Sequence, residues 1–212
     1  MDCKIYDYRD LGLQSLDLLV CSGEGKMSKA IRKFNHLTGV KGEAAELSHT
    51  ARIYKGYLCD KLEVIESTTL NDWTNPPKKG VQKNPFDLWL KNYNGVVWVI
   101  QLCFERTQEF YEKDYEFWNK HKNDPYESGI LGGAELLLCG LKLDRVVRLV
   151  WPNYKPLETK NPHCSELIIK NLQWHGFLNG INANRMPPSV FWPDGDLYKY
   201  VRCVISEPKR IK

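Results

Sequence analysis

The sequence predicts an α+β fold in a single domain that spans residues 1–212. Three observations support this prediction. Short apolar runs of strand length are interspersed with longer runs of helical periodicity. The chain has 212 residues, of which 42% are apolar, and this is enough to bury a core of its own. It contains no internal repeat and no low-complexity segment, so a repeat architecture is not indicated.

Turn residues separate the elements of the first half of the chain. The predicted elements are a strand at 16–20, a helix at 28–37, strands at 48–54 and 62–68, a helix at 86–93, a strand at 95–102 and a helix at 105–122. The polar, proline-rich stretch at 70–85 is interpreted as an inserted loop. In the helix at 105–122, four aromatic residues recur at roughly helical spacing, which is typical of core packing. They are Phe110, Tyr111, Phe117 and Trp118.

The second half of the chain carries an enlarged segment at 123–160. Its predicted elements, and those that follow it, are a turn at 123–129, a helix or strand at 133–141, a strand at 144–150, a helix that begins near 161 and a last strand at 198–205.

Charge and hydropathy exclude several classes of protein. The net charge of +4 is small and the basic residues are scattered, so no nucleic-acid partner is expected. The longest apolar runs fall far short of the roughly 20 residues of a membrane-spanning helix. The N-terminus lacks the basic-then-apolar order of a signal peptide. The expected location of the protein is therefore the cytoplasm, where the chain is made. Packaging in a particle or non-classical export stays open.

The seven cysteines predict neither a disulfide framework nor a zinc site, because their number is odd, their spacings are wide and no CxxC pair occurs. No cofactor or metal is predicted. Gly25, Lys26 and Ser28 resemble part of a phosphate-binding loop. That motif fails because Val20 replaces its first glycine and Met27 replaces the hydroxyl residue after the lysine.

The strands at 48–54 and 62–68 are predicted to form an antiparallel hairpin in which facing residue numbers sum to 115. This register places His49 opposite Glu66 on a core-directed face. The other pairs are Ala51 with Val64, Ile53 with Leu62 and, on a solvent face, Arg52 with Glu63. A histidine beside a carboxylate is the orienting pair of nucleophilic catalysis, although a structural histidine satisfied by a carboxylate gives the same pattern.

The stretch "NPHCSELIIKNL" at 161–172 predicts a helix with Asn161 as N-cap and Pro162 as its first residue. Cys164 would then lie in the first turn, where the helix dipole favours a thiolate. Cys164, Leu167, Ile168 and Leu172 form the core-facing set, while Ser165 and Glu166 point elsewhere. His163 lies about 100° away around the helix, which makes it a poor base for Cys164. An ordinary buried cysteine fits the same pattern.

These pieces resemble the circularly permuted branch of the NlpC-type papain-like cysteine amidases and peptidases, typified by YiiX and YaeF. The matching segments extend over nearly the whole chain, and "SHTARIY" and "HCSELI" are the most specific. Compared with that family, the segments at 70–85 and 123–160 are enlarged, and both are interpreted as inserted loops. The resemblance implies a papain-like sheet or partial barrel with the nucleophile at the start of a packed helix. It further implies Cys164 as nucleophile, His49 as base and Glu66 as the third polar residue, in the order His, Glu, Cys.

The activity implied by the resemblance is cleavage of an amide or peptide bond through a thioester, on a peptide, peptidoglycan-like or acylated substrate. Tyr126 is a candidate oxyanion donor or substrate contact, or else a packed turn residue. Two alternatives stay open. One is a lipid ester or thioester hydrolase or acyltransferase, because the lecithin retinol acyltransferase branch uses similar parts. The other is a non-catalytic binding or virion-associated module. The oligomeric state is not predicted.

Overall fold

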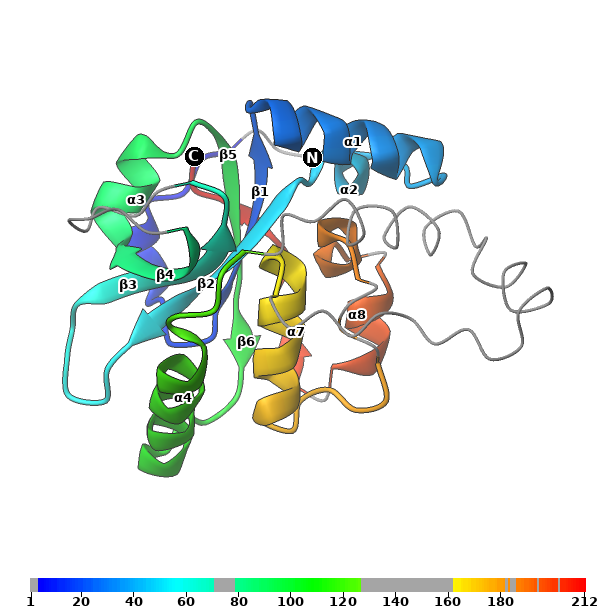
Figure 1. Ribbon diagram of the computed structural model, residues 1–212. Coiled ribbons are helices and arrows are strands. Elements are labelled where there is room, and N and C mark those ends of the chain that lie inside the picture. Colours follow the sequence, from blue (N-terminus) through cyan, green and yellow to red (C-terminus); the bar gives the residue numbers. More distant parts are fainter. Residues whose placement is uncertain are drawn as a thin grey trace.

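A computed structural model describes residues 4–70, 79–126, 162–181, 183, 186–193, 195–201 and 203–212. Within them the protein is α+β, as predicted, and is built around an antiparallel sheet with strand order β4-β3-β2-β1-β5-β8 (Figure 1). The strands of this sheet are β1 (Leu18–Gly23), β2 (His49–Lys55), β3 (Leu62–Thr68), β4 (Gly80–Pro85), β5 (Gly95–Ile100) and β8 (Lys209–Arg210). The short strands β6 (Leu102–Cys103) and β7 (Val204–Ile205) pair with each other.

Helices lie on both faces of the sheet and along one end of it (Figure 1). The α-helices are α1 (Lys26–Leu37), α2 (Glu43–Glu46), α3 (Phe86–Asn92), α4 (Gln108–His121), α7 (Cys164–Trp174) and α8 (Asp196–Tyr200), and the 3-10 helices are η1 (Tyr8–Leu11) and η3 (Pro188–Phe191). Within the described part of the chain, none of these helices combines the length and the apolar character that crossing a membrane requires.

The two faces of the sheet carry separate apolar clusters, because successive residues of a strand point to opposite sides. On one face, Ala51 and Val64 pack with Phe86 and Trp89 of α3. On the other face, α7 lies against β2 and β3. The predicted strands at 48–54 and 62–68 and the predicted helices at 86–93 and 105–122 are confirmed, with no end displaced by more than three residues.

The β2–β3 hairpin forms, but its register differs from the predicted one. Ala51 pairs with Glu66, a position that we had assigned to His49, and every other facing pair is shifted by two residues in the same way. A shift of two residues leaves each side chain on its original face. His49 and Glu66 therefore remain on one face as diagonal neighbours, which is still within reach of two long side chains.

The opposite face of the hairpin is buried, which corrects the prediction that it meets solvent. The side chain of Arg52 is fully buried, and its guanidinium lies 2.9 Å from the carboxylate of Asp114 on α4. Ser15 also donates a hydrogen bond to Asp114. The predicted pair between Arg52 and Glu63 is therefore wrong. Glu63 pairs instead with Lys83 of the neighbouring strand, at 2.8 Å.

Two further predictions of elements are corrected. The last six residues of the predicted loop at 70–85 form strand β4, whose pairing with β3 extends the sheet. The predicted last strand at 198–205 is the short helix α8 followed by the two-residue strand β7. The predicted elements at 133–141 and 144–150 lie outside the described residues.

Candidate functional site

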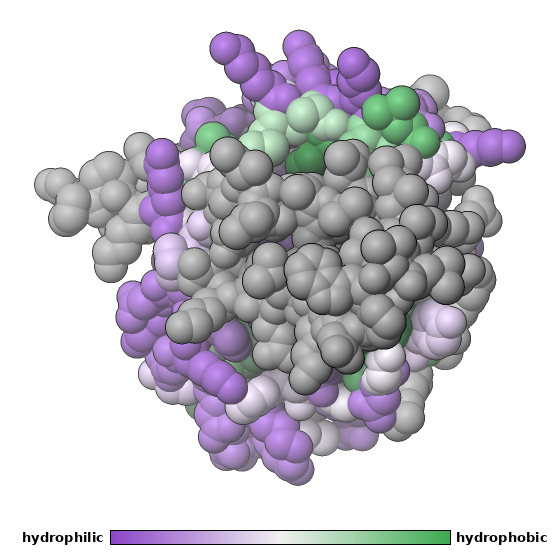
Figure 2. Space-filling view, turned by 45° about the vertical axis from the view of Figure 1, so that its right-hand side comes forward, coloured by the Kyte–Doolittle hydropathy of each residue, from purple (hydrophilic) through white to green (hydrophobic). Residues whose placement is uncertain are grey.

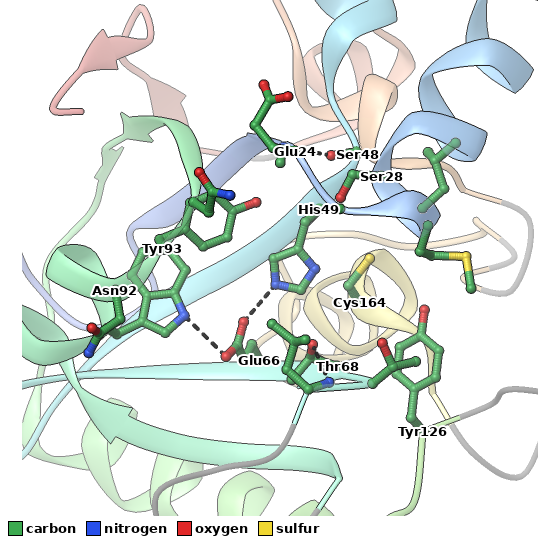
Figure 3. A pocket seen from close by; sticks show the side chains of 18 of the residues that line it. Glu24, Ser28, Ser48, His49, Glu66, Thr68, Asn92, Tyr93, Tyr126 and Cys164 are labelled. Carbon is green, nitrogen blue, oxygen red and sulfur yellow. Dashed lines mark hydrogen bonds and ion pairs between the residues drawn. The ribbon is translucent and has the colours of Figure 1, made fainter.

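Cys164, His49 and Glu66 come together at one end of the sheet. At this end β1 and β3 finish and β2 begins. His49 is the first residue of β2 and pairs with Cys21 near the end of β1. The N-terminus of α7 approaches this end, because the Ser67 hydroxyl of β3 donates to the carbonyl of Pro162 at 2.5 Å. Cys164, at the start of α7, thus lies beside the ring of His49 (Figure 3).

The His49 ring and the Glu66 carboxylate form a short contact, with Nε2 of His49 2.7 Å from Oε2 of Glu66. The other carboxylate oxygen of Glu66 accepts hydrogen bonds from Nε1 of Trp89 at 3.1 Å and from Nε2 of Gln82 at 3.4 Å. Because three donors from three elements converge on it, this carboxylate is fixed in position, and it in turn fixes the plane of the His49 ring. The Tyr93 ring stacks on His49, with centroids 6.4 Å apart.

Cys164 is buried, with 4% of its surface exposed, and it interacts with the ring nitrogen of His49 that Glu66 leaves available (Figure 3). Burial alone raises the pKa of the Cys164 thiol, but hydrogen bonds with His163 and His49 and the charge of His49 outweigh it and hold the pKa well below its ordinary value. Burial lowers the pKa of His49, while its interactions with Cys164 and Glu66 raise it to about 10. Both shifts favour a thiolate beside an imidazolium.

The start of α7 differs from the predicted one in a way that matters to Cys164. The helix begins at Cys164 itself, so Pro162 lies outside it and the N-cap is His163 rather than Asn161. The His163 ring accepts a hydrogen bond from the backbone N–H of Glu166 at 3.3 Å, and the Glu166 carboxylate accepts one from the N–H of His163 at 3.4 Å. This reciprocal capping box places Cys164 at the very end of the helix dipole.

The cap also corrects the predicted orientation of three side chains. The His163 ring interacts with the thiol of Cys164, although we had expected it to lie too far around the helix. Ser165 and Glu166, expected to point away from the core, are fully buried. Ser165 donates to the carbonyl of Met186, and Glu166 pairs with Lys170 at 2.6 Å. The predicted core-facing set of α7 is confirmed, since Cys164, Leu167, Ile168 and Leu172 are all buried.

A cavity of about 460 Å³ opens over Cys164, His49 and Glu66 (Figure 3). Its lining is mixed. Amide and hydroxyl side chains contribute, namely Ser28, Ser48, Thr68, Thr69, Gln82, Asn84, Asn92 and Asn94. Apolar and aromatic side chains also contribute, namely Met27, Ile31, Leu70, Trp89, Tyr93 and Tyr126. The space has the size of a small-molecule or peptide-residue subsite.

Tyr126 lies at this cavity, next to Cys164, as Figure 3 shows. The segment that carries it is held against β4 by a hydrogen bond from the N–H of Val81 to the carbonyl of Asp124, at 2.9 Å. Gly80 permits this contact, because its φ is +112° and a Cβ there would lie 2.3 Å from the same carbonyl. Burial, and to a smaller extent the charge of Cys164, raises the pKa of Tyr126, so its hydroxyl stays protonated.

The structure brings together the three residues that the sequence predicted, Cys164, His49 and Glu66, whereas the residues that support them were not predicted. Trp89 sits in a predicted helix without any signal of its role, and Gln82 falls in a stretch interpreted as a loop. The predicted helix starts too early and includes His163, whereas His163 lies outside the helix as its N-cap, so the predicted angle of about 100° to Cys164 does not apply. A comparison with models of protein families and with curated proteins finds no match to this chain.

Proposed function

We propose that the protein is a cysteine hydrolase that cleaves an amide or peptide bond through a thioester intermediate. One observation carries the proposal: Cys164, His49 and Glu66 form a buried chain of interactions in which the pKa of the thiol is lowered and that of the imidazole is raised. The antiparallel sheet, with the cysteine at the start of a packed helix, supports a circularly permuted papain-like fold with the chain order His, Glu, Cys.

In the first step, the Cys164 thiolate attacks the carbonyl carbon of the substrate and its C–S bond forms as the carbonyl oxygen becomes an oxyanion. The backbone N–H of Cys164 has no acceptor within the described part of the chain, as expected for the first residue of a helix. We assign it as one oxyanion donor. The hydroxyl of Tyr126 is the candidate for the second donor, since it stays protonated and lines the same cavity.

In the second step, the imidazolium of His49 gives its proton to the leaving amine as the carbon–nitrogen bond breaks, which leaves a thioester on Cys164. Neutral His49 then takes a proton from water, whose oxygen attacks the thioester and releases a carboxylic acid. Cys164 leaves as a thiolate and His49 is again protonated. Glu66 stabilises the imidazolium form in both halves of the cycle through its 2.7 Å contact.

The lining of the cavity supports an amide or peptide substrate. The amide side chains of Asn84, Asn92 and Asn94 offer both donors and acceptors, which is what a peptide group needs on its two edges. A second candidate, an acyl ester or thioester substrate, is favoured by Met27, Ile31 and Leu70, since these apolar side chains line the same cavity. On that substrate the leaving group is an alkoxide or a thiolate, and the residues keep their roles.

The test is hydrolysis by the wild type and by Cys164→Ala, with matched peptide amides and acyl esters as substrates. We expect Cys164→Ala to lose at least about a thousandfold in kcat/KM, because no other group replaces the nucleophile. Cys103→Ala, which removes an exposed thiol, serves as the control and should keep full activity. Retained turnover in Cys164→Ala would refute the proposal, and a wild type that hydrolyses neither substrate would favour a binding module.

A further inference from the structure

Helix α1 carries an apolar stripe that the described part of the chain does not cover. The stripe recurs every three or four residues and comprises Met27, Ala30, Ile31, Phe34 and Leu37. Met27 is 56% exposed and Leu37 is 65% exposed, which is unusual for two large apolar side chains on one helix. Figure 2 shows an apolar area at the top of the molecule, over α1, with hydrophilic side chains along its upper border.

The face of α1 that packs on the rest of the molecule is a different one and is polar. Asn35, the one fully buried residue of the helix, donates to the carbonyls of Ala45 and Leu47. Arg32 donates to Gly23 near the end of β1. Because successive helical residues are about 100° apart, Phe34 lies about a quarter turn from Asn35. The stripe is therefore not the face that attaches α1 to the protein.

Lysines flank the stripe on the side away from the packed face. Lys26, Lys29 and Lys33 are exposed, and none of them forms an ion pair with a residue that the structure describes. The first turn of α1 contains no acidic residue. Lysines near a helix N-terminus are opposed by the helix dipole, so this arrangement does not favour the stability of the helix itself. It places three positive charges beside an exposed apolar surface.

We propose that this surface, the stripe together with Lys26, Lys29 and Lys33, docks on an anionic lipid bilayer. A helix that combines an apolar stripe with a basic flank lies in the plane of the membrane interface, its apolar side chains among the acyl chains and its lysines at the headgroups. The phosphates of a nucleic acid would neutralise the charges of the lysines but would leave the apolar stripe in water. A neutral apolar partner would leave the three positive charges without counter-charges.

The position of α1 relates this docking to the cavity, because Lys26, Met27, Ser28 and Ile31 line the cavity over Cys164. A bilayer bound at α1 therefore lies beside the cavity opening, and a substrate attached to or dissolved in the membrane would reach Cys164 directly. The docking surface does not rest on the proposed hydrolase activity, since binding to lipid requires none of the catalytic groups.

The test is co-sedimentation of the full chain with vesicles of phosphatidylcholine alone and of phosphatidylcholine mixed with phosphatidylglycerol. We expect binding to the mixed vesicles that weakens with added salt, and little binding to the neutral ones. Lys29→Gln/Lys33→Gln should weaken binding roughly thirtyfold. Phe34→Gln/Leu37→Gln should weaken it roughly tenfold or more. None of these four residues lines the cavity, so hydrolysis of a soluble substrate should be unchanged.

Matched controls come from distant parts of the molecule. Lys120→Gln/Lys122→Gln removes the same charge near the end of α4, at the opposite end of the molecule from α1 in Figure 1. Tyr57→Gln/Leu58→Gln removes two exposed apolar side chains from the tip of the β2–β3 hairpin. Both controls should bind like the wild type. Absence of wild-type binding to the mixed vesicles, self-association of the chain through α1, or equal losses in the controls would overturn the proposal.

Discussion

At the scale of single residues, the environment of the Cys164 thiol departs most from the expectation for a buried cysteine. Such a thiol is normally neutral, since burial disfavours its charged form. Here two histidines interact with it from different elements, His49 from β2 and His163 from the cap of α7 itself. The second histidine has two roles at once, because its ring both caps the helix and lowers the pKa of the neighbouring thiol.

Replacing His163 by asparagine separates these two roles. Asparagine is a good N-cap, so the helix start should survive, but it removes the imidazole from Cys164. We expect the pKa of Cys164 to rise and its alkylation at mildly acidic pH to slow, with the melting temperature unchanged. His163→Ala should show the same change in alkylation and also lose about 1 kcal/mol of stability with the cap. An unchanged pH profile in His163→Asn would mean that His163 is only a cap.

At the scale of elements, the sequence was sufficient wherever local pattern decides the structure. Both strands of the β2–β3 hairpin follow from runs of apolar and β-branched residues, and their alternation placed His49 and Glu66 on one face. The register itself was wrong. That register rests on satisfying every facing pair at once, with Arg52 opposite Glu63 among them, whereas Arg52 pairs with Asp114, 62 residues further along the chain. A partner so distant in sequence leaves no sign in the local pattern of the hairpin.

The start of α7 and strand β4 were missed for similar reasons. Histidine is rarely an N-cap, so the sequence favoured Asn161 and Pro162, and the capping box between His163 and Glu166 could not be recognised by its residue types. Strand β4 is polar, and it exists because β3 offers it an edge to pair with. Both features depend on contacts with other elements rather than on local preference.

The buried pair of Arg52 and Asp114 joins β2 to α4, and Asn171 of α7 donates to the same carboxylate. Asp114→Ala should therefore cost about 3–5 kcal/mol of unfolding free energy, because it leaves the guanidinium buried without a counter-charge. Urea denaturation measures this loss.

A matched control is Glu63→Ala, which breaks the more exposed pair with Lys83 and should cost no more than about 1 kcal/mol. The double variant Arg52→Met/Asp114→Leu should recover most of the stability lost in Asp114→Ala, since it removes both charges. A loss of less than about 1 kcal/mol in Asp114→Ala would contradict the role assigned to this pair.

At the scale of the whole molecule, we propose that the fold brings together three segments, at 49, 66 and 164, to stabilise a thiolate. The sign of each pKa shift defines the expected pH range of hydrolysis. As pH falls through the lowered pKa of Cys164, the thiolate gains a proton and activity is lost. As pH rises through about 10, His49 loses the proton that the leaving group needs, and hydrolysis is lost again.

The most direct test of this claim is the rate of alkylation against pH, with the modified residue mapped among the seven cysteines. We predict preferential labelling of Cys164 that persists well below the ordinary thiol pKa of about 8.5. In His49→Ala the labelling should move to higher pH, because burial then acts against a thiolate that only His163 still stabilises. Labelling of another cysteine in preference, or a wild-type profile that coincides with that of His49→Ala, would contradict the account.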